Sequence, residues 1–387
     1  MYLHGKENWT DFKIDYERIC PLLAAVRHHQ GWVLSLFATS ETVASNRASV
    51  EAFAEDVSKS AEIEGEVFDP EHVRSSLCRR LELDFPDNGK AIPRQVDGAV
   101  SVVLDAVLNA EAELTEERLF GWHASLFPTG YSGLFKIATG RYREDEMQVV
   151  SGGFGREKVH YRAPSPALVP GLMRDFLAWY NAADGMDPYV KAAMAHVWFV
   201  MIHPFDDGNG RLSRAISDKL IARSDGPGVK FYSVSNAIMQ ERKRYYSLLE
   251  SLGHSDGDIT EWVEWFVGRI EAGLKTAECA LEATLRKTRF WNRYADANFN
   301  ERQRKIVNML FEGFDGKLTS GKWAKICKVS SDTALSDIRN LLDRGILVKA
   351  AAGGRSTNYE LKYGLRDDLR VGKFSKGLLA GEDGYAP

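Results

Sequence analysis

The segment 203–214, with the sequence HPFDDGNGRLSR, constrains the fold of this 387-residue chain most strongly, because it follows one helical pattern and opens another. Its glycines and Asn209 therefore fall in a turn between two helices. The first N–H groups of a helix have no partner within the helix, and the helix dipole adds positive potential there. Because Gly208 and Gly210 allow close approach to this backbone, the turn is suited to bind phosphates.

The side chains of this segment add the other groups that phosphate chemistry requires. Arg211 and Arg214 are three residues apart and share a helical face, where each guanidinium can bind a different phosphate. Asp207 offers a carboxylate oxygen of the kind that Mg²⁺ prefers. His203, as a neutral imidazole, can accept the proton of an attacking hydroxyl. Each residue alone has an ordinary structural explanation, but together they predict a site for a magnesium-bound nucleotide.

Helical periodicity dominates the rest of the chain and predicts a mainly α-helical protein. We expect helices in the regions 15–58, 96–108, 115–126, 169–180, 188–202, 211–220, 236–252 and 260–286. Two short β-prone runs, 147–150 and 158–161, surround a glycine-rich turn and predict a hairpin. A cluster of Pro, Asp, Asn and Gly at 84–93 predicts a linker.

A separate pattern begins near residue 300. Helices are expected at 301–311 and 332–344 with a short run at 318–324 between them, followed by a strand from Gly345, a turn at 353–355 and a strand through Tyr359. This order predicts a small helical domain closed by a two-stranded wing. The expected division of the chain is an N-terminal helical region (1–92), a central helical domain (93–290), the small domain (296–365) and a tail (366–387).

Composition excludes several classes of function. A formal net charge of −4 gives no overall attraction to nucleic acid or to anionic membranes. The four cysteines are far apart and form no CxxC pair, so neither a zinc site nor a disulfide framework is expected. No early apolar run is long enough for a signal sequence or a membrane span. We therefore expect a soluble cytoplasmic protein that makes no membrane contact.

The segment 203–214 resembles the active-site motif HxFx(D/E)GNGRxxR of the Fic (Fido) family of protein adenylyltransferases, and it matches at every specified position. The resemblance implies an all-helical domain, about 96–269 here. It also implies an enzyme that transfers AMP from ATP to a Ser, Thr or Tyr hydroxyl of a target protein and releases pyrophosphate. Relatives with similar motifs move UMP, phosphocholine or phosphate, so the transferred group stays open.

The resemblance also implies a role for each residue of the motif. His203 would be the general base, Asp207 the Mg²⁺ ligand and Phe205 a core anchor. The remaining residues would bind the nucleotide: Gly208, Asn209 and Gly210 hold the α and β phosphates, Arg211 neutralises their charge, Arg214 binds the γ phosphate, and Tyr246, on a helix further along, lines the base pocket.

Three flanking features also resemble this family. The stretch SAEIEG from Ser60 to Gly65 is similar to the inhibitory motif (S/T)xxxE(G/N), which implies that Glu64 pairs with Arg214 and holds the enzyme inactive. The hairpin at 147–161 resembles the flap that binds an extended stretch of the target protein by strand addition. The N-terminal region, around Trp9, resembles the helical region that precedes the Fic domain in one bacterial subgroup.

The C-terminal pattern resembles a winged helix, with 330–342 in the position of the recognition helix. It has no basic excess, with Asp332, Asp337 and Asp343 against Arg339 and Arg344, which predicts weak or no DNA binding. Protein binding or a homodimer contact is the alternative use of this domain. Two alternative functions also stay open. One is a hydrolase in which Glu64 positions water to remove AMP, and the other is a nucleotide-sensing DNA-binding regulator.

Overall fold

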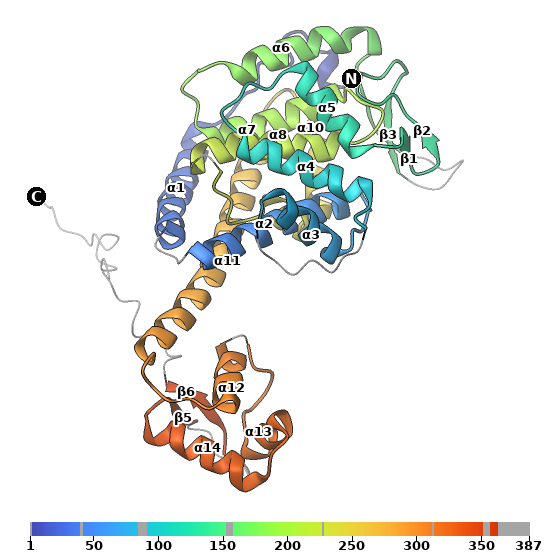
Figure 1. Ribbon diagram of the computed structural model, residues 1–387. Helices are drawn as coiled ribbons and strands as arrows, with labels where there is room; N and C mark the ends of the chain where they lie inside the picture. The colour runs from blue at the N-terminus through green and yellow to red at the C-terminus, as the bar shows by residue number, and fades with distance from the viewer. Residues whose placement is uncertain are drawn as a thin grey trace, which may run out of the picture. The chain divides into compact units, whose positions relative to one another are not determined.

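The structure, a computed structural model, describes residues 2–38, 42–83, 91–151, 158–226, 228–311, 313–350 and 357–362. The chain divides into two compact units, Met1–Glu282 and Ala283–Pro387. Both are mainly helical, and the strands form three two-stranded antiparallel sheets (Figure 1). The predicted mainly α fold is therefore confirmed, whereas the finer division at residues 92, 290 and 365 stays a prediction.

The first unit contains most of the helices. Its elements are η1 (Leu3–Gly5), α1 (Tyr16–Ala38), α2 (Thr42–Ile63), α3 (Pro70–Arg80), α4 (Arg94–Leu108), α5 (Glu116–Leu126), β1 (Tyr131–Ser132), β2 (Phe135–Lys136), β3 (Gln148–Ser151), β4 (Lys158–Arg162), η2 (Pro166–Leu168), α6 (Val169–Asn181), α7 (Pro188–Ile202), α8 (Asn209–Asp225), α9 (Val234–Gln240), α10 (Arg242–Gly253) and α11 (Thr260–Arg293). The boundary between the two units falls within α11.

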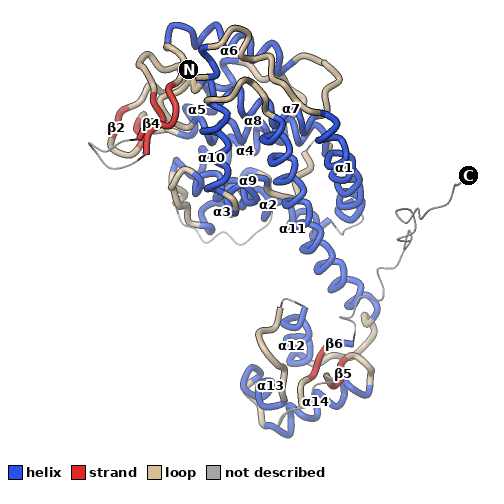
Figure 2. The backbone as a smooth tube through the Cα atoms, turned by 180° about the vertical axis from the view of Figure 1, so that it is seen from behind, coloured by secondary structure: helices blue, strands red, loops and turns tan. Residues whose placement is uncertain are grey.

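The helix α7 lies in the core of this unit. It is apolar on nearly all sides, and its side chains from Tyr189 to Phe199 are buried without interruption. Asp187 caps its start by accepting hydrogen bonds from the N–H groups of Tyr189 and Val190, with Pro188 in the first turn. α7 packs on α8 and α6, and α8 also contacts α2, α4 and α5, so the turn between α7 and α8 is surrounded by helices (Figures 1 and 2).

A buried ionic cluster fixes α2 against the core. The carboxylate of Asp56, on α2, forms an ion pair with Lys230 and accepts a hydrogen bond from the N–H of Ser235 at 3.1 Å. Lys230 also lies 3.3 Å from a carboxylate oxygen of Asp218, on α8. Burial, followed by the neighbouring charge of Asp56, raises the pKa of Asp218 to about 7. Through this cluster α2 is tied to α8, and its C-terminal end lies beside the start of α8.

One prediction about a helix needs correction. The single helix predicted at 236–252 is wrong, because α9 ends and α10 begins at Glu241, whose φ of −118° and ψ of 32° are not helical. Its own N–H bonds to the Ile238 carbonyl, while its carbonyl accepts the N–H of Tyr245. The run at 318–324 belongs to a helix that starts at Ser320. Elsewhere the boundaries move: α2 continues beyond 58 to Ile63, and α11 continues beyond 286 to Arg293.

The predicted hairpin is present as β3 and β4, which pair antiparallel, while its glycine-rich turn at 152–157 lies outside the described residues. A second hairpin, β1 and β2, was not predicted. The two hairpins lie together at one side of the first unit, and both views agree on this (Figures 1 and 2). The predicted linker at 84–93 lies mostly outside the described residues.

The second unit contains α12 (Glu301–Phe311), α13 (Ser320–Cys327), α14 (Ser331–Asp343), β5 (Leu347–Lys349) and β6 (Tyr359–Leu361). Its core includes Phe290, Trp323 and Ile338. The helices and the antiparallel pair agree with the predicted order, but the turn at 353–355 and the tail at 366–387 lie outside the described residues.

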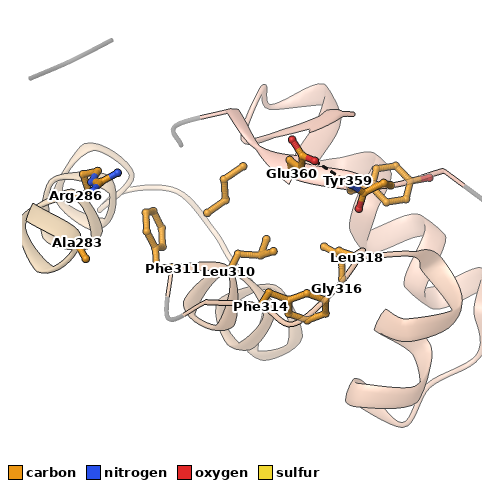
Figure 3. Close-up of a pocket in the computed structure, with 11 residues that line it drawn as sticks. Ala283, Arg286, Leu310, Phe311, Phe314, Gly316, Leu318, Tyr359 and Glu360 are labelled. Atoms are coloured by element: carbon orange, nitrogen blue, oxygen red, sulfur yellow. Dashed lines mark hydrogen bonds between the residues drawn. The ribbon is translucent and has the colours of Figure 1, made fainter. Parts of the chain in front are cut away.

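Figure 3 shows a pocket of about 420 Å³ in the second unit. Phe311 and Phe314 contribute aromatic walls, and Tyr359 and Glu360 come from β6.

In the described parts of the whole chain we find no helix whose length and apolar content would let it cross a membrane.

The crossing of α4 and α5 gives a direct test of this packing. A Cβ added to Gly98 would lie 1.8 Å from the Ser125 carbonyl oxygen. This oxygen belongs to the backbone, so it cannot move aside by a change of side-chain rotamer. We expect Gly98→Ala to lower the free energy of unfolding by about 1–3 kcal/mol in urea titrations, through overpacking. The control is Gly121→Ala on α5, where nothing lies within 4 Å and the change should be neutral or slightly stabilising. Equal unfolding midpoints for the two variants would contradict this crossing.

Candidate functional site

The turn between α7 and α8 has a fixed backbone. α7 ends at His203, which is left-handed with φ 50° and ψ 59° and donates its N–H to the Phe199 carbonyl at 3.0 Å. α8 begins after Gly208, whose φ is 80°. A Cβ at Gly208 would lie 2.9 Å from Cε2 of Phe127, so both the conformation and the space favour glycine.

The side chains of Phe205 and Asn209 hold the backbone of the turn in place. Phe205 is fully buried and stacks on His123 of α5, with ring centroids 4.3 Å apart and planes 10° apart. The side-chain amide of Asn209 accepts the Phe205 N–H at 3.0 Å and donates to the Phe205 carbonyl at 2.8 Å. Because both ends of this amide serve the turn, any contact of Asn209 with a phosphate is left to its backbone N–H, at the start of α8.

His123 is a residue of the site that sequence reasoning missed. Its Nδ1 accepts the Gly140 N–H at 3.0 Å, and its Nε2–H donates to the Asp207 carbonyl at 3.2 Å. Burial lowers its pKa to about 4, so the ring is neutral with the proton on Nε2. A lone histidine on a helix carries no sequence signal for this positioning role.

His203 has the geometry of a base. Its Nδ1–H donates to the Val200 carbonyl at 3.2 Å, which leaves the lone pair on Nε2. Burial, and after it the charge of Arg143, lowers the pKa of His203 to about 4. Arg143 is itself buried and donates from Nε to the His203 carbonyl at 2.8 Å and from its N–H to the Pro204 carbonyl at 3.0 Å. The motif alone does not point to Arg143, because it lies sixty residues earlier.

Asp207 presents a partly exposed carboxylate beside the same turn. One oxygen accepts a hydrogen bond from the Ser132 hydroxyl, on the β1–β2 hairpin, and the other accepts the Gly208 N–H at 2.5 Å. The neighbouring Asp206 has a different task, since it accepts the Ala138 N–H at 2.7 Å and so anchors the hairpin. Ser132 was missed because strands of two residues leave no recognisable pattern.

Arg211 and Arg214, on the first turns of α8, are buried, and each is paired with a carboxylate from the end of α2. Nη2 of Arg214 lies 2.8 Å from Oε1 of Glu64, while Nε donates to the Ser60 hydroxyl at 2.9 Å. Nη1 of Arg211 lies 2.9 Å from Oε2 of Glu66. Glu66 was not predicted. Two guanidinium nitrogens, Arg214 Nη1 and Arg211 Nε, are buried and have no hydrogen-bond partner among the described residues.

The end of α2 places these carboxylates through its C-terminal cap. The N–H of Gly65 bonds to the Glu62 carbonyl and the N–H of Glu66 to the Ala61 carbonyl, each at 3.0 Å. Gly65 has a φ of 90°. This is the Schellman arrangement, with glycine in the left-handed position. We call the residues Glu64, Gly65 and Glu66 the cap turn.

Two residues of α10 hold the cap turn. The Tyr246 hydroxyl donates to the Ile63 carbonyl at 3.0 Å and lies 3.2 Å from Oε2 of Glu64, and Arg242 donates to the same carbonyl at 2.7 Å. Burial, with the charge of Glu64 next, raises the pKa of Tyr246 to about 12. Tyr245 is buried, as expected of a core residue.

The carboxylate of Glu64 lies directly on the first turn of α8. A Cβ added to Gly210 would lie 2.1 Å from Oε1 of Glu64. The structure thus brings all the predicted site residues into one region: the turn and α8 supply His203, Asp207, Gly208, Asn209, Gly210, Arg211 and Arg214, α2 and its cap supply Ser60 and Glu64, and α10 supplies Tyr246.

The chain is similar to known proteins in sequence and in fold. Residues 113–221 match the family model described as the Fic/DOC family, and residues 2–83 match a domain of unknown function, DUF4172. The chain is similar to proteins named protein adenylyltransferase Fic. The one from Aedes aegypti is 29% identical over 248 residues, which cover 62% of this chain and 45% of the relative. The one from Culex quinquefasciatus is 29% identical over 235 residues, covering 59% and 42%. These matches span less than half the length of either relative.

Two solved structures share the fold. A Fic family protein from Desulfovibrio desulfuricans superimposes with a TM-score of 0.51 at 20% identity, covering 88% of this chain and 96% of that one. A Fic domain containing signaling protein from Bacteroides thetaiotaomicron gives 0.50 at 19% identity, covering 66% and 98%.

The two histidines of the site give a test that needs no ligand. Because their folded pKa values of about 4 lie below the ordinary 6.5, acid favours the unfolded chain, and their contribution to stability falls as the pH drops from 6.5 toward 4. We expect long-range ¹H–¹⁵N NMR spectra to show neutral rings from pH 8 to 5, with the proton on Nδ1 of His203 and on Nε2 of His123. His203→Ala and His123→Gln assign the signals. A titration midpoint near 6.5 for either ring in the folded protein would refute the assignment.

Proposed function

From the match of residues 113–221 to the Fic/DOC family, we propose that this protein is an adenylyltransferase that transfers AMP from ATP to a Ser, Thr or Tyr hydroxyl of a target protein. One observation carries the proposal. A neutral imidazole, that of His203, has its free Nε2 on the same short turn that opens α8 and precedes two buried arginines. A base beside an anion site is the minimum that phosphoryl-group transfer to a hydroxyl requires.

In the proposed reaction, His203 on this turn accepts one proton, and one bond to the α phosphorus replaces another. Nε2 of His203 takes the proton from the target hydroxyl, and the hydroxyl oxygen bonds to the α phosphorus of ATP. The bond from that phosphorus to the oxygen bridging to the β phosphate breaks, and pyrophosphate leaves. Val200 and Arg143 keep the imidazole in the tautomer and position that this step needs. Because its pKa is about 4, the base is unprotonated throughout the neutral range.

The start of α8 binds the phosphates in this proposal. The N–H groups of Asn209, Gly210 and Arg211 are the first of the helix and have no helical partner. Arg211 neutralises the charge on the α and β phosphates, and Arg214 binds the γ phosphate, as the family resemblance implies. Tyr246, whose ring is partly exposed, then borders the site of the base.

The residues present fit a Mg²⁺ ion held mainly by the nucleotide. Among the described residues no three metal-binding side chains lie together, but Asp207 offers a partly exposed carboxylate beside the turn. Mg²⁺ in nucleotide sites usually takes one or two carboxylates together with phosphate oxygens and water. Asp207 would hold the ion, which neutralises phosphate charge when bound, and the hydrogen bond from Ser132 would keep the carboxylate in place.

The β3–β4 hairpin is the proposed binding place of the target. Its strands pair with each other at the side of the unit near the turn, and Tyr161 ties β4 to α7 by donating its hydroxyl to the Met201 carbonyl at 2.7 Å. Val149, Val150 and Val159 are exposed on these strands. An extended segment of a target can add to such a pair as a further strand, which presents its hydroxyl to the turn.

We propose that the enzyme is held inactive by Glu64. Its carboxylate takes the guanidinium that the γ phosphate would use and lies on the first turn of α8. ATP bound without this clamp would have its α phosphorus misaligned for attack in line with the leaving oxygen.

A second candidate function, removal of AMP from a modified target, rests on the same observation, because Glu64 lies inside the site and could position water there. An assay on AMP-loaded target separates it from transfer. The third candidate is a regulator in which the second unit binds DNA and the segment 203–214 senses a nucleotide, and a gel shift tests it.

The assignment of His203 predicts a specific pattern of loss. We expect His203→Ala, in a background where Glu64 is replaced by glycine, to lower incorporation of labelled AMP by about 10²–10⁴-fold, since a general base contributes that much to rate. ATP affinity, measured by isothermal titration calorimetry, should change little, because a base adds little to ground-state binding. Unchanged labelling by a correctly folded His203→Ala protein would remove this residue from the mechanism.

The assignment of Glu64 predicts activation. Glu64→Gly should raise labelling of target, or of the chain itself, by on the order of 10²-fold, because it frees Arg214 for the γ phosphate. The matched control is Glu62→Gly: Glu62 pairs with Lys59 at 2.7 Å instead and should have little effect. The double variant with Arg214→Ala should stay inactive. Equal labelling by the wild type and by Glu64→Gly would contradict autoinhibition by this residue.

A further inference from the structure

We propose that Glu66 is a second inhibitory carboxylate, which occupies Arg211 while Glu64 occupies Arg214. The inference rests on the proposed function, in which both arginines bind nucleotide phosphates. It adds a residue that the inhibitory motif does not contain, and it predicts which nucleotides each carboxylate opposes.

The contact between Glu66 and Arg211 is direct and partly buried. Oε2 of Glu66 lies 2.9 Å from Nη1 of Arg211, whose side chain is 7% exposed. The same guanidinium lies over the Phe127 ring at 4.8 Å, and its Nη2 is 3.9 Å from Asp207. Arg211 is thus held on three sides, and Glu66 is the close ionic contact among them.

The cap turn explains why both carboxylates reach α8. In a continued helix Glu66 would lie on the face of Glu62, four residues earlier. The left-handed Gly65 ends the helix instead, and the bond from the Glu66 N–H to the Ala61 carbonyl turns the chain back. Glu64 and Glu66 then flank Gly65 and each meets one arginine.

The pairing cancels the charge that a nucleotide needs. Two guanidinium groups face two carboxylates at 2.8 and 2.9 Å, and Asp207 adds a further negative charge near Arg211. Phosphates therefore meet no positive excess at these side chains until the carboxylates leave. Since Tyr246 and Arg242 hold the Ile63 carbonyl just before the cap turn, the two carboxylates are also held as one unit.

The two carboxylates should oppose different parts of the nucleotide. Arg214 is assigned to the γ phosphate, so Glu64 competes with ATP and has little to compete with in ADP. Arg211 is assigned to the α and β phosphates, so Glu66 competes with ATP and ADP alike. Removal of each negative charge therefore has its own signature in binding.

The experiment is isothermal titration calorimetry of ATP and ADP with Mg²⁺ against the full-length chain, with His203→Ala in every variant to prevent turnover. Glu66→Gln keeps the shape and removes the charge of a side chain that is 39% exposed, so the fold should persist. We expect it to raise the affinity for ATP and for ADP by similar factors, on the order of tenfold. Glu64→Gln should raise the affinity for ATP more than that for ADP.

Glu62→Gln is the matched control and should change neither affinity, because Glu62 pairs with Lys59. A response of Glu64→Gln with none from Glu66→Gln would overturn the inference and leave the proposed function intact. A response of Glu66→Gln to ATP alone would overturn the assignment of Arg211 and with it the inference. Absence of ATP and ADP binding in every variant would overturn the proposed function as well.

Discussion

Two buried guanidinium groups on the first turns of α8 set the requirements that the rest of the first unit meets. A buried cation without a partner is costly, so Arg211 and Arg214 need anions at hand whether or not a nucleotide is bound. The structure supplies them from the end of α2. This in turn requires α2 to be fixed against α8, and Lys230 does so by lying between Asp56 on α2 and Asp218 on α8. The anchoring of α2 and the pairing of the two arginines are therefore parts of one electrostatic arrangement.

The geometry of the turn depends on residues outside the segment 203–214. Arg143 and Val200 set the position and tautomer of His203. His123 donates a hydrogen bond to the Asp207 carbonyl, and the Ser132 hydroxyl donates one to the Asp207 carboxylate. Without these contacts a short turn would sample many conformations, and misplacement of reacting groups by about 1 Å is enough to cost on the order of 10²-fold in rate.

The sequence predicted the parts of this arrangement that are continuous along the chain. The helices around the turn follow from apolar periodicity, and the turn itself from its glycines and charged residues. It could not predict partners that are far apart: Ser132 and Asp207 are separated by 75 residues, His123 and Asp207 by 84, and Glu66 and Arg211 by 145. An isolated polar residue adds no periodic pattern to the sequence, so its distant partner cannot be identified from it. The break at Glu241 was missed for a related reason, because a polar residue on an amphipathic pattern looks the same in a continuous helix and between two helices.

The three glutamates near the end of α2 show how one backbone angle divides similar residues among different tasks. Glu62, Glu64 and Glu66 alternate along the chain, and charge alone does not distinguish them. Helical geometry points Glu62 toward Lys59, one turn back. Beyond Ile63 the helix stops, and the φ of 90° at Gly65 turns Glu66 away from the Glu62 face and toward Arg211. A side chain at position 65 would be strained in this conformation. Gly65 is thus needed for more than presenting Glu64 to Arg214, because its conformation also brings the carboxylate of Glu66 to Arg211.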